Sequence, residues 1–292
     1  MLRTRIVVGS LLAGMTLGIL FVDEHCAPWY PYLFTFFAVV GALGCWELLG
    51  LIPLEQRPSA WLCHLGVQIV VVANWIRPLH ESCPQCFPWS DPWPLIGLAL
   101  AATMIAAFLL EMSKYRGPGD SAARVALTLF VVTYLGLLAS FLAQLRWLPN
   151  AAQASNALML TIFVPKCCDI GAYCTGRLVG RNRMTPVLSP KKTWEGAAGG
   201  TALAVMTAVG VSFYGAKPEY YLLKAILFGS IVGAAGMFGD LAESLLKRES
   251  LKKDASETVP GFGGVLDVVD SVLFAAPVAF FSFTTAWLSP LG

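Results

Sequence analysis

The sequence predicts an all-α, polytopic integral membrane protein with about nine transmembrane helices and a cytoplasmic N-terminus. Of its 292 residues, 57% are hydrophobic and only 13% are charged, whereas soluble domains carry about 25% charged residues. The hydrophobic residues form long runs that follow one another along the chain, as in a bundle of membrane helices. The sequence lacks the short segments of alternating polarity that are typical of a membrane β-barrel.

Each apolar run has roughly the 20 residues that a helix needs to cross a bilayer. The runs cover residues 5–22, 31–54, 61–78, 93–112, 124–144, 157–175, 194–213, 221–239 and 267–288. The third and sixth runs are the least apolar, because they contain polar residues. These are His64, Gln68, Asn74, Lys166 and Asp169. The first run follows a basic start, as in a secretory signal peptide, but no small-residue cleavage site precedes Asp23, and we expect a retained helix.

The distribution of Lys and Arg predicts the orientation of the chain. With these spans, the N-terminus and every second loop lie on one side, and most of the 20 basic residues lie there too. The opposite side receives only Arg77, Arg146, Lys217 and Lys224. Because positive residues collect in cytoplasmic loops, we expect a multi-pass protein of the cytoplasmic (inner) membrane, with an outward C-terminus and an active site that faces the cytoplasm.

We expect one membrane domain over residues 1–292. Residues 1–156 are assigned to packing and to potential dimer contacts, and residues 157–292 form the catalytic half with its cytoplasmic motif loops. No basic tract with interleaved aromatic residues indicates nucleic-acid binding, and the bilayer is the expected environment.

Cys83 and Cys86 form a C-x-x-C pair in an outward loop. In an oxidising compartment such a pair can form a disulfide, and a disulfide or inert thiols are favoured over a metal site. A zinc site would need a second pair of ligands at suitable spacing, and His80 is the only nearby candidate.

The first polar segment is "VPKCCDIGAYCTGRLVGRNR". Lys166, Asp169 and Tyr173 are spaced i, i+3 and i+7, so they share one face of a helix. Charged groups at membrane depth are costly unless they face one another or a polar cavity. Two interpretations stay open, a structural Lys–Asp pair and a polar face that lines a site.

The second segment is "SPKKTWEGAAGG". Ser189 and Pro190 predict a helix start, with Ser as N-cap and Pro at the first helical position. Lys191, Lys192 and Thr193 would then stand in the first turn, where free N–H groups and two cations favour a phosphate. The alternative is that these lysines anchor the span at the lipid headgroups. A close helix-packing face is predicted by Gly196, Gly199 and Gly200.

The third segment begins with "GDLAESLLKRESLKKD". One helix face is predicted to carry Asp240, Ser244, Lys247 and Arg248, which are spaced i, i+4, i+7 and i+8. The turn "VPGFGG" follows, and its glycines let backbone N–H groups approach an anion closely.

Asp267 and Asp270 come next, at the mouth of the last span. Carboxylates on a membrane helix are costly unless they are paired or bind a metal, and oxygen ligands suit Mg²⁺, which commonly bridges carboxylates and phosphates. The alternative is a solvated interfacial loop with ion pairs.

Taken together, the three segments indicate phosphoryl or nucleotidyl transfer at the membrane surface. None contains His, which argues against a His-based nucleophile or base.

These segments resemble the motif set of the phosphatidate cytidylyltransferases, also called CDP-diacylglycerol synthases, over residues 160–275. The resemblance implies transfer of a cytidylyl group from CTP to phosphatidate, giving CDP-diacylglycerol and pyrophosphate for phospholipid biosynthesis. It also implies Mg²⁺ and a homodimer in the membrane. One metal ion and two metal ions are both open alternatives. The other hypotheses are a related enzyme acting on another lipid phosphate, a polytopic transporter and an inactive homologue.

The resemblance assigns roles by motif position. The expected catalytic residues are Asp240, Lys247, Arg248 and Asp267. The expected metal ligands are Asp240, Asp267 and Asp270. The expected substrate-binding residues are Asp169, Arg177, Ser189, Lys191, Lys192, Thr193, Ser244, Lys253, Asp254, Gly263 and Gly264. Two positions depart from the usual pattern, because Phe262 stands where the family usually has His and Val268 where it often has Arg.

Overall fold

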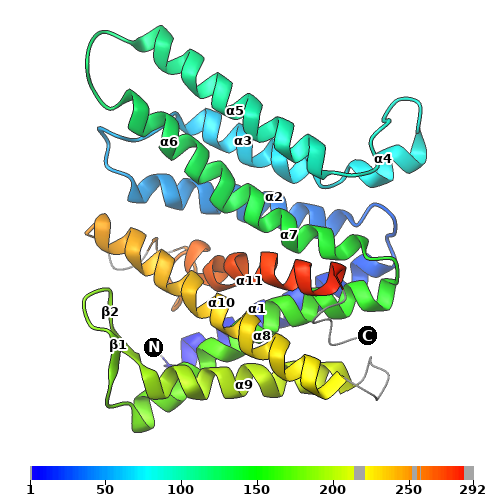
Figure 1. Ribbon diagram of the computed structural model, residues 1–292, viewed down its shortest axis with the longest axis vertical. Coiled ribbons are helices and arrows are strands. Elements are labelled where there is room, and N and C mark those ends of the chain that lie inside the picture. Colours follow the sequence, from blue (N-terminus) through cyan, green and yellow to red (C-terminus); the bar gives the residue numbers. More distant parts are fainter. Residues whose placement is uncertain (1, 214–220, 252–254, 257, 286–292) are drawn as a thin grey trace. The chain divides into compact units, whose positions relative to one another are not determined.

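The computed structural model describes residues 2–213, 221–251, 255–256 and 258–285, and these residues form two compact, mainly helical units (Figure 1). Unit 1 comprises Met1–Ser140 and Lys252–Leu266, and unit 2 comprises Phe141–Leu251 and Asp267–Gly292. The structure therefore confirms the predicted all-α polytopic class.

The helices of unit 1 follow the first predicted spans. They are α1 (Leu2–Glu24), α2 (Pro31–Leu51), α3 (Ala60–Ala73), α4 (Ile76–Ser82), α5 (Trp93–Lys114), α6 (Ser121–Val132), a π-helical turn (Thr133–Leu137) and the start of α7 (Leu138–Gln144). Unit 2 contains the end of α7 and the remaining elements. These are a 3₁₀ turn (Leu145–Trp147), α8 (Ala151–Val179), β1 (Arg183–Thr185), β2 (Ser189–Thr193), α9 (Trp194–Phe213), α10 (Tyr221–Glu249) and α11 (Leu266–Thr284).

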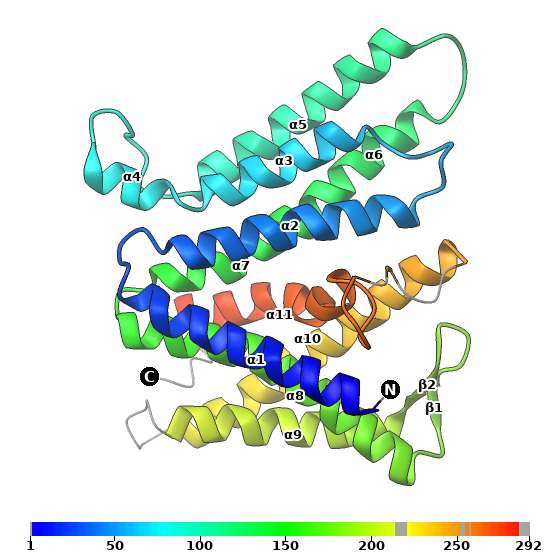
Figure 2. The same cartoon turned by 180° about the vertical axis from the view of Figure 1, so that it is seen from behind.

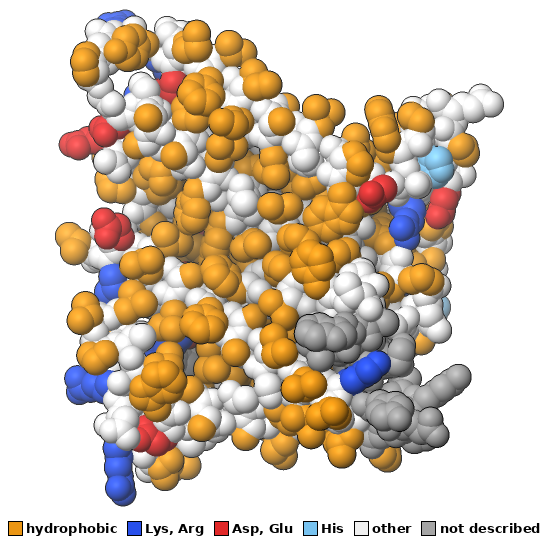
Figure 3. All heavy atoms as spheres, viewed as in Figure 1, with side chains coloured by type: hydrophobic (Ala, Val, Ile, Leu, Met, Phe, Trp, Pro, Cys, Tyr) orange, Lys and Arg blue, Asp and Glu red, His pale blue; other side chains and the backbone are white. Residues whose placement is uncertain are grey.

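Eight of the described helical segments are long and apolar enough to cross a membrane, or nine if α3 and α4 together count as one span. On the face that Figure 3 shows, hydrophobic side chains predominate, and most of the charged side chains lie toward the left and right edges of the view. On α5, for example, Leu98 and Ile105 are largely exposed. Such surfaces are suited to contact with lipid.

The third predicted span is one continuous helix in the sequence interpretation but is broken in the structure, where α3 and α4 meet at 49°. Pro78 has no N–H to donate to the carbonyl of Asn74, four residues earlier, so a regular helix cannot continue through this point. The Asn74 side chain donates instead to the Val70 carbonyl and to Ser140 Oγ, both at 2.8 Å. The polar residue thus stabilises the break from within unit 1.

Cys83 and Cys86, which follow α4, form a disulfide. This is one of the two interpretations that the sequence favours. His80, the only nearby candidate for a metal ligand, places Nδ1 2.6 Å from the Phe87 carbonyl oxygen.

Helices α8 and α9 pack closely through small residues, which confirms the predicted glycine face. A Cβ atom at Gly200 would lie 2.7 Å from the Cys168 carbonyl oxygen, and one at Gly196 would lie 2.8 Å from the Ala172 carbonyl oxygen. Only glycine lets the backbones approach this closely. The contact fixes α9, and the hairpin that precedes it, against α8.

We expect Gly200→Ala to destabilise the protein by about 1–3 kcal/mol, because the added methyl group would overpack the α8–α9 contact. Gly210→Ala on the same helix is the matched control, because a Cβ atom there would meet nothing within 4 Å. Replacing a helical glycine at such an open position stabilises by about 0.5–1 kcal/mol. Thermal denaturation in detergent should therefore separate the two variants, and equal melting temperatures would contradict the packing argument.

The predicted helix start at Ser189–Pro190 is wrong, because residues 189–193 form strand β2, which pairs antiparallel with β1 in a hairpin beside α8 and α9 (Figure 2). The helix begins at Trp194. Thr193 is the N-cap, since its Oγ1 accepts a hydrogen bond from the Gly196 N–H at 3.1 Å. Lys191 and Lys192 consequently stand on a strand and not in a first helical turn.

Glu195 fastens the base of this hairpin. Its carboxylate accepts hydrogen bonds from the Arg181 N–H (3.1 Å), the Asn182 N–H and Asn182 Nδ2 (2.7 Å). An acidic residue in the first helical turn also suits the positive end of the helix dipole. The residues SPKKT are thereby held on a short, anchored strand.

Candidate active site

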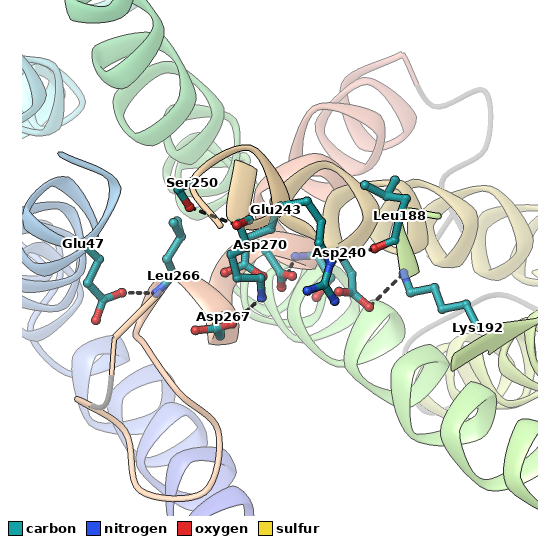
Figure 4. Close-up of polar contacts among 12 residues, drawn as sticks. Glu47, Leu188, Lys192, Asp240, Glu243, Ser250, Leu266, Asp267 and Asp270 are labelled. Carbon is teal, nitrogen blue, oxygen red and sulfur yellow. Dashed lines mark hydrogen bonds and ion pairs between the residues drawn. The ribbon is translucent and has the colours of Figure 1, made fainter. Parts of the chain in front are cut away.

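Three carboxylates of unit 2 meet between α10 and α11. Asp240 and Glu243 come from one face of α10 and Asp270 from α11, and each can offer an oxygen within 4.8 Å of the others (Figure 4). The helices come this close because Gly239 faces α11: a Cβ atom there would lie 3.0 Å from the Phe274 Cβ. Asp240 and Asp270 are two of the predicted metal ligands, and the structure brings them together.

Glu243 is the member of this cluster that the sequence analysis missed. Its spacing from Asp240 (i, i+3) and from Lys247 (i, i+4) was the available signal, since these residues share a helix face. Glu243 is only 1% exposed. We call Asp240, Glu243 and Asp270 the acidic cluster.

The acidic cluster fits a divalent cation. Glu243 Oε1 is buried and has no hydrogen-bond partner among the residues that the structure describes. A buried polar atom without a partner costs about 1–3 kcal/mol, and more when it is charged. Hard oxygen ligands from several carboxylates are the set that divalent cations such as Mg²⁺ or Ca²⁺ prefer. A cation bound here would give Glu243 Oε1 the partner that the described residues do not supply.

Lys247 connects Glu243 with Asp267. Its Nζ lies 2.8 Å from Glu243 Oε2 and 2.6 Å from Asp267 Oδ1, and its side chain is 12% exposed. Asp267, predicted as a metal ligand, is therefore the ion-pair partner of a predicted catalytic lysine and not a member of the acidic cluster. Its assignment as a metal ligand stays a prediction.

Lys166 joins α8 to the acidic cluster. Its Nζ lies 3.5 Å from Asp169 Oδ2 and 3.6 Å from Asp270 Oδ1. The predicted Lys–Asp pair is thus present, and it also borders the cluster. These contacts agree with the structural pair, and the interpretation that this face lines a substrate site stays a prediction.

The hairpin reaches α10 at two points. Lys192 Nζ lies 2.9 Å from Asp240 Oδ2 and donates to the Met237 carbonyl oxygen at 3.3 Å. Arg248 Nε donates to the carbonyl oxygen of Leu188, at 3.3 Å. Figure 4 shows Lys192 and Leu188 beside Asp240. Of the predicted phosphate-binding cations, Lys192 therefore pairs with a member of the acidic cluster, and Arg248 binds the hairpin.

The other predicted site residues lie elsewhere or have local roles. Arg177 is exposed and donates to the Tyr173 hydroxyl, one turn away on α8. Ser189 and Lys191 lie on β2, and Ser244 lies half-buried on α10. Lys253 and Asp254 lie outside the described residues.

The glycine turn of unit 1 forms as predicted. Gly261 and Gly263 have φ values of 84° and 113°, which other residues rarely adopt. The Gly263 N–H donates to the Val259 carbonyl oxygen at 3.0 Å, so the turn itself uses this donor. Phe262, one of the departures from the usual pattern, points its ring at α1, because a Cβ atom at Gly9 would lie 3.3 Å from that ring.

Comparison with known proteins identifies the family. The sequence profile described as the cytidylyltransferase family matches residues 3–286. The chain belongs to the cytidylyltransferase family. Several relatives named phosphatidate cytidylyltransferase are similar to it along most of their length. The relative from Pseudomonas aeruginosa is 30% identical over 291 residues, which cover 99% of this chain and 100% of the relative.

Two further cytidylyltransferases of that name give similar values. The Bacillus subtilis relative is 28% identical over 96% of this chain and 97% of its own length. The Helicobacter pylori relative is 29% identical over 94% of this chain and 89% of its own length. In this cytidylyltransferase, the acidic cluster with Lys166, Lys192 and Lys247 around it can hold a cation and a polyphosphate side by side.

Proposed function

We propose that this protein transfers a cytidylyl group from CTP to phosphatidate and releases pyrophosphate, so that CDP-diacylglycerol is formed for phospholipid biosynthesis. The observation that carries the proposal is the near full-length similarity to relatives named phosphatidate cytidylyltransferase. The acidic cluster and its surrounding cations supply the chemistry that a reaction between two phosphate groups needs.

In the proposed reaction, a phosphate oxygen of phosphatidate attacks the α-phosphorus of CTP in line. A new P–O bond forms, the bond from the α-phosphorus to the α,β-bridging oxygen breaks, and pyrophosphate leaves with that oxygen. The attacking phosphate is already largely ionised at pH 7, since its second pKa is near 6. A strong general base is therefore unnecessary, in agreement with polar segments that contain no His.

The acidic side chains have the role of holding the metal ion in this proposed reaction. Asp240, Glu243 and Asp270 would hold Mg²⁺, with Asp267 and a second ion as further options of the proposal. When bound, Mg²⁺ supplies Lewis-acid stabilisation of the negative charge on the triphosphate.

The cations beside the acidic cluster act on the substrates and on the carboxylates. Lys192 and Arg248 can neutralise the charge that develops on the leaving pyrophosphate. Lys166 and Lys247 hold Asp270, Glu243 and Asp267 in place through the ion pairs of unit 2.

The proposal includes the side of the membrane and the assembly. The distribution of Lys and Arg favours a cytoplasmic active site in the inner membrane, where CTP is available. The homodimer rests on the resemblance to the family alone. Cross-linking in native membranes, followed by size analysis of the purified protein, tests it.

Purified protein with radiolabelled CTP, Mg²⁺ and a panel of lipid phosphates tests the function. We expect labelled CDP-diacylglycerol and an equal amount of pyrophosphate with phosphatidate, and much less product with polyprenyl or ether-linked phosphates. Transfer to another lipid phosphate alone would replace phosphatidate as the substrate. If label entered proteoliposomes without covalent transfer, the transporter hypothesis would displace the enzyme.

A further inference from the structure

Glu47, near the end of α2, is a buried carboxylate with an unusual set of partners in unit 1. It is 2% exposed. Its Oε1 accepts hydrogen bonds from Ser256 Oγ at 2.6 Å and Thr258 Oγ1 at 2.9 Å. These hydroxyls lie more than 200 positions away in the sequence, in the segment that leads to the glycine turn.

The same carboxylate binds the backbone at the start of α11. Glu47 Oε1 accepts from the Val265 N–H at 2.9 Å, and Oε2 accepts from the Leu266 N–H at 2.7 Å (Figure 4). N–H groups at a helix start have no partner within the helix, and they carry the positive end of its dipole. A carboxylate from another helix therefore caps α11, as Asp23 of α1 caps α2 through the Tyr32 and Leu33 N–H groups.

Gly264 leaves the space that the Glu47 carboxylate occupies. A Cβ atom at Gly264 would lie 2.5 Å from Glu47 Oε2, so a larger residue would displace the carboxylate. The substrate-binding role expected of Gly264 stays a prediction. The structure shows that the residue leaves room for Glu47.

A carboxylate in an apolar membrane helix is costly unless its partners compensate it, and the four partners named above, all among the described residues, belong to the segment around the glycine turn. We infer that Glu47 is a positioning residue for the reaction. It holds the start of α11 through the Val265 and Leu266 N–H groups, and Asp267 and Asp270 belong to the first turns of that same helix. The effect on turnover rests on the proposed function, whereas the anchoring of the helix start does not.

The test compares Glu47→Gln and Glu47→Asp with the unchanged full-length protein in detergent–lipid micelles. Glutamine keeps the size but turns one acceptor into a donor, which opposes the N–H and O–H groups around it. We expect kcat to fall about 10- to 100-fold, as for other residues that orient a site, with KM for CTP changed by less than about threefold because Glu47 binds no substrate. Glu47→Asp keeps the charge and should recover part of kcat.

Hydrogen exchange gives a readout that is independent of activity. The peptide containing Val265 and Leu266 should take up deuterium faster in Glu47→Gln than in the unchanged protein. Glu111→Gln is the matched control, because Glu111 of α5 is a buried carboxylate of unit 1 that pairs with Arg124 of α6 at 2.7 Å. It should lower the melting temperature while leaving kcat and the exchange of Val265 and Leu266 unchanged.

The outcomes separate the two proposals. Unchanged exchange in Glu47→Gln overturns the anchoring, whatever the enzyme does. Faster exchange with unchanged kcat, or an equal loss of kcat in Glu111→Gln, shows that Glu47 is structural only. If Glu47→Gln does not fold, the double variant Ser256→Ala/Thr258→Val removes two donors and should lower kcat three- to tenfold, by the same reasoning. If the protein without substitutions shows no cytidylyl transfer, the proposed function is refuted, and the result of the hydrogen-exchange experiment still stands.

Discussion

Asp240→Asn should lower the rate of CDP-diacylglycerol formation on the order of a thousandfold, while the protein still folds and inserts. The substitution removes one charge from the acidic cluster, and the loss of one preorganised electrostatic group at a transition state costs about 10²- to 10³-fold in rate. The Asp240 side chain is 36% exposed and pairs with a lysine that is itself 22% exposed. Folding should therefore tolerate the neutral isostere.

Initial rates at several Mg²⁺ concentrations measure this effect. Glu249→Gln is the control, because it neutralises an exposed carboxylate at the end of the same helix. Glu243 and Asp267 both pair with Lys247. Glu243→Gln and Asp267→Asn, measured beside Asp240→Asn, show which of the two also holds the metal, since only the loss of a metal ligand should raise the Mg²⁺ requirement. Near-normal turnover in Asp240→Asn would remove this residue from the site.

Lys247→Met should both destabilise unit 2 and abolish activity. Glu243 and Asp267 have side chains that are 1% and 9% exposed, and the methionine would leave both carboxylates without this cation. Removing one partner of a buried ion pair costs about 3–5 kcal/mol. That loss corresponds to a fall of about 10 °C in melting temperature for a chain of this size.

Thermal denaturation and activity should respond differently to two companion variants. Lys247→Arg keeps the charge and should retain most of the stability. The double variant Lys247→Met/Glu243→Gln removes one stranded charge, so it should recover part of the melting temperature but no activity. A Lys247→Met protein as stable as the unchanged one would show that the ion pairs of Lys247 with Glu243 and Asp267 contribute little to stability.

The spans could be predicted because the cost of exposing polar groups to lipid leaves a strong signal in the sequence. Local signals were less reliable at the helix starts. Ser189–Pro190 has the chemistry of an N-cap, yet Thr193, with Gly196 three residues later, serves as the cap and residues 189–193 pair as a strand. The break after α3 also had a visible cause, because Asn74 and Pro78 stand four residues apart.

The candidate site was predictable where its residues share one motif or helix face. Asp240, Lys247 and Arg248 are examples, since their helical spacing alone puts them together. The same helical spacing also predicts that Glu243 lies on this face, although it was not among the expected site residues. Glu47 could not be found in this way, because its partner Leu266 is 219 positions away and only the tertiary fold joins them.

The contact between Phe262 and Gly9 has a consequence for the sequences of related chains. The phenylalanine ring occupies the space that a side chain at position 9 would need. Chains that carry an aromatic residue at position 262 should therefore keep glycine at position 9, whereas chains with a smaller residue at 262 are free to enlarge position 9. The two positions should covary although they lie 253 positions apart in the sequence, so a substitution in the glycine turn should be accompanied by one in α1.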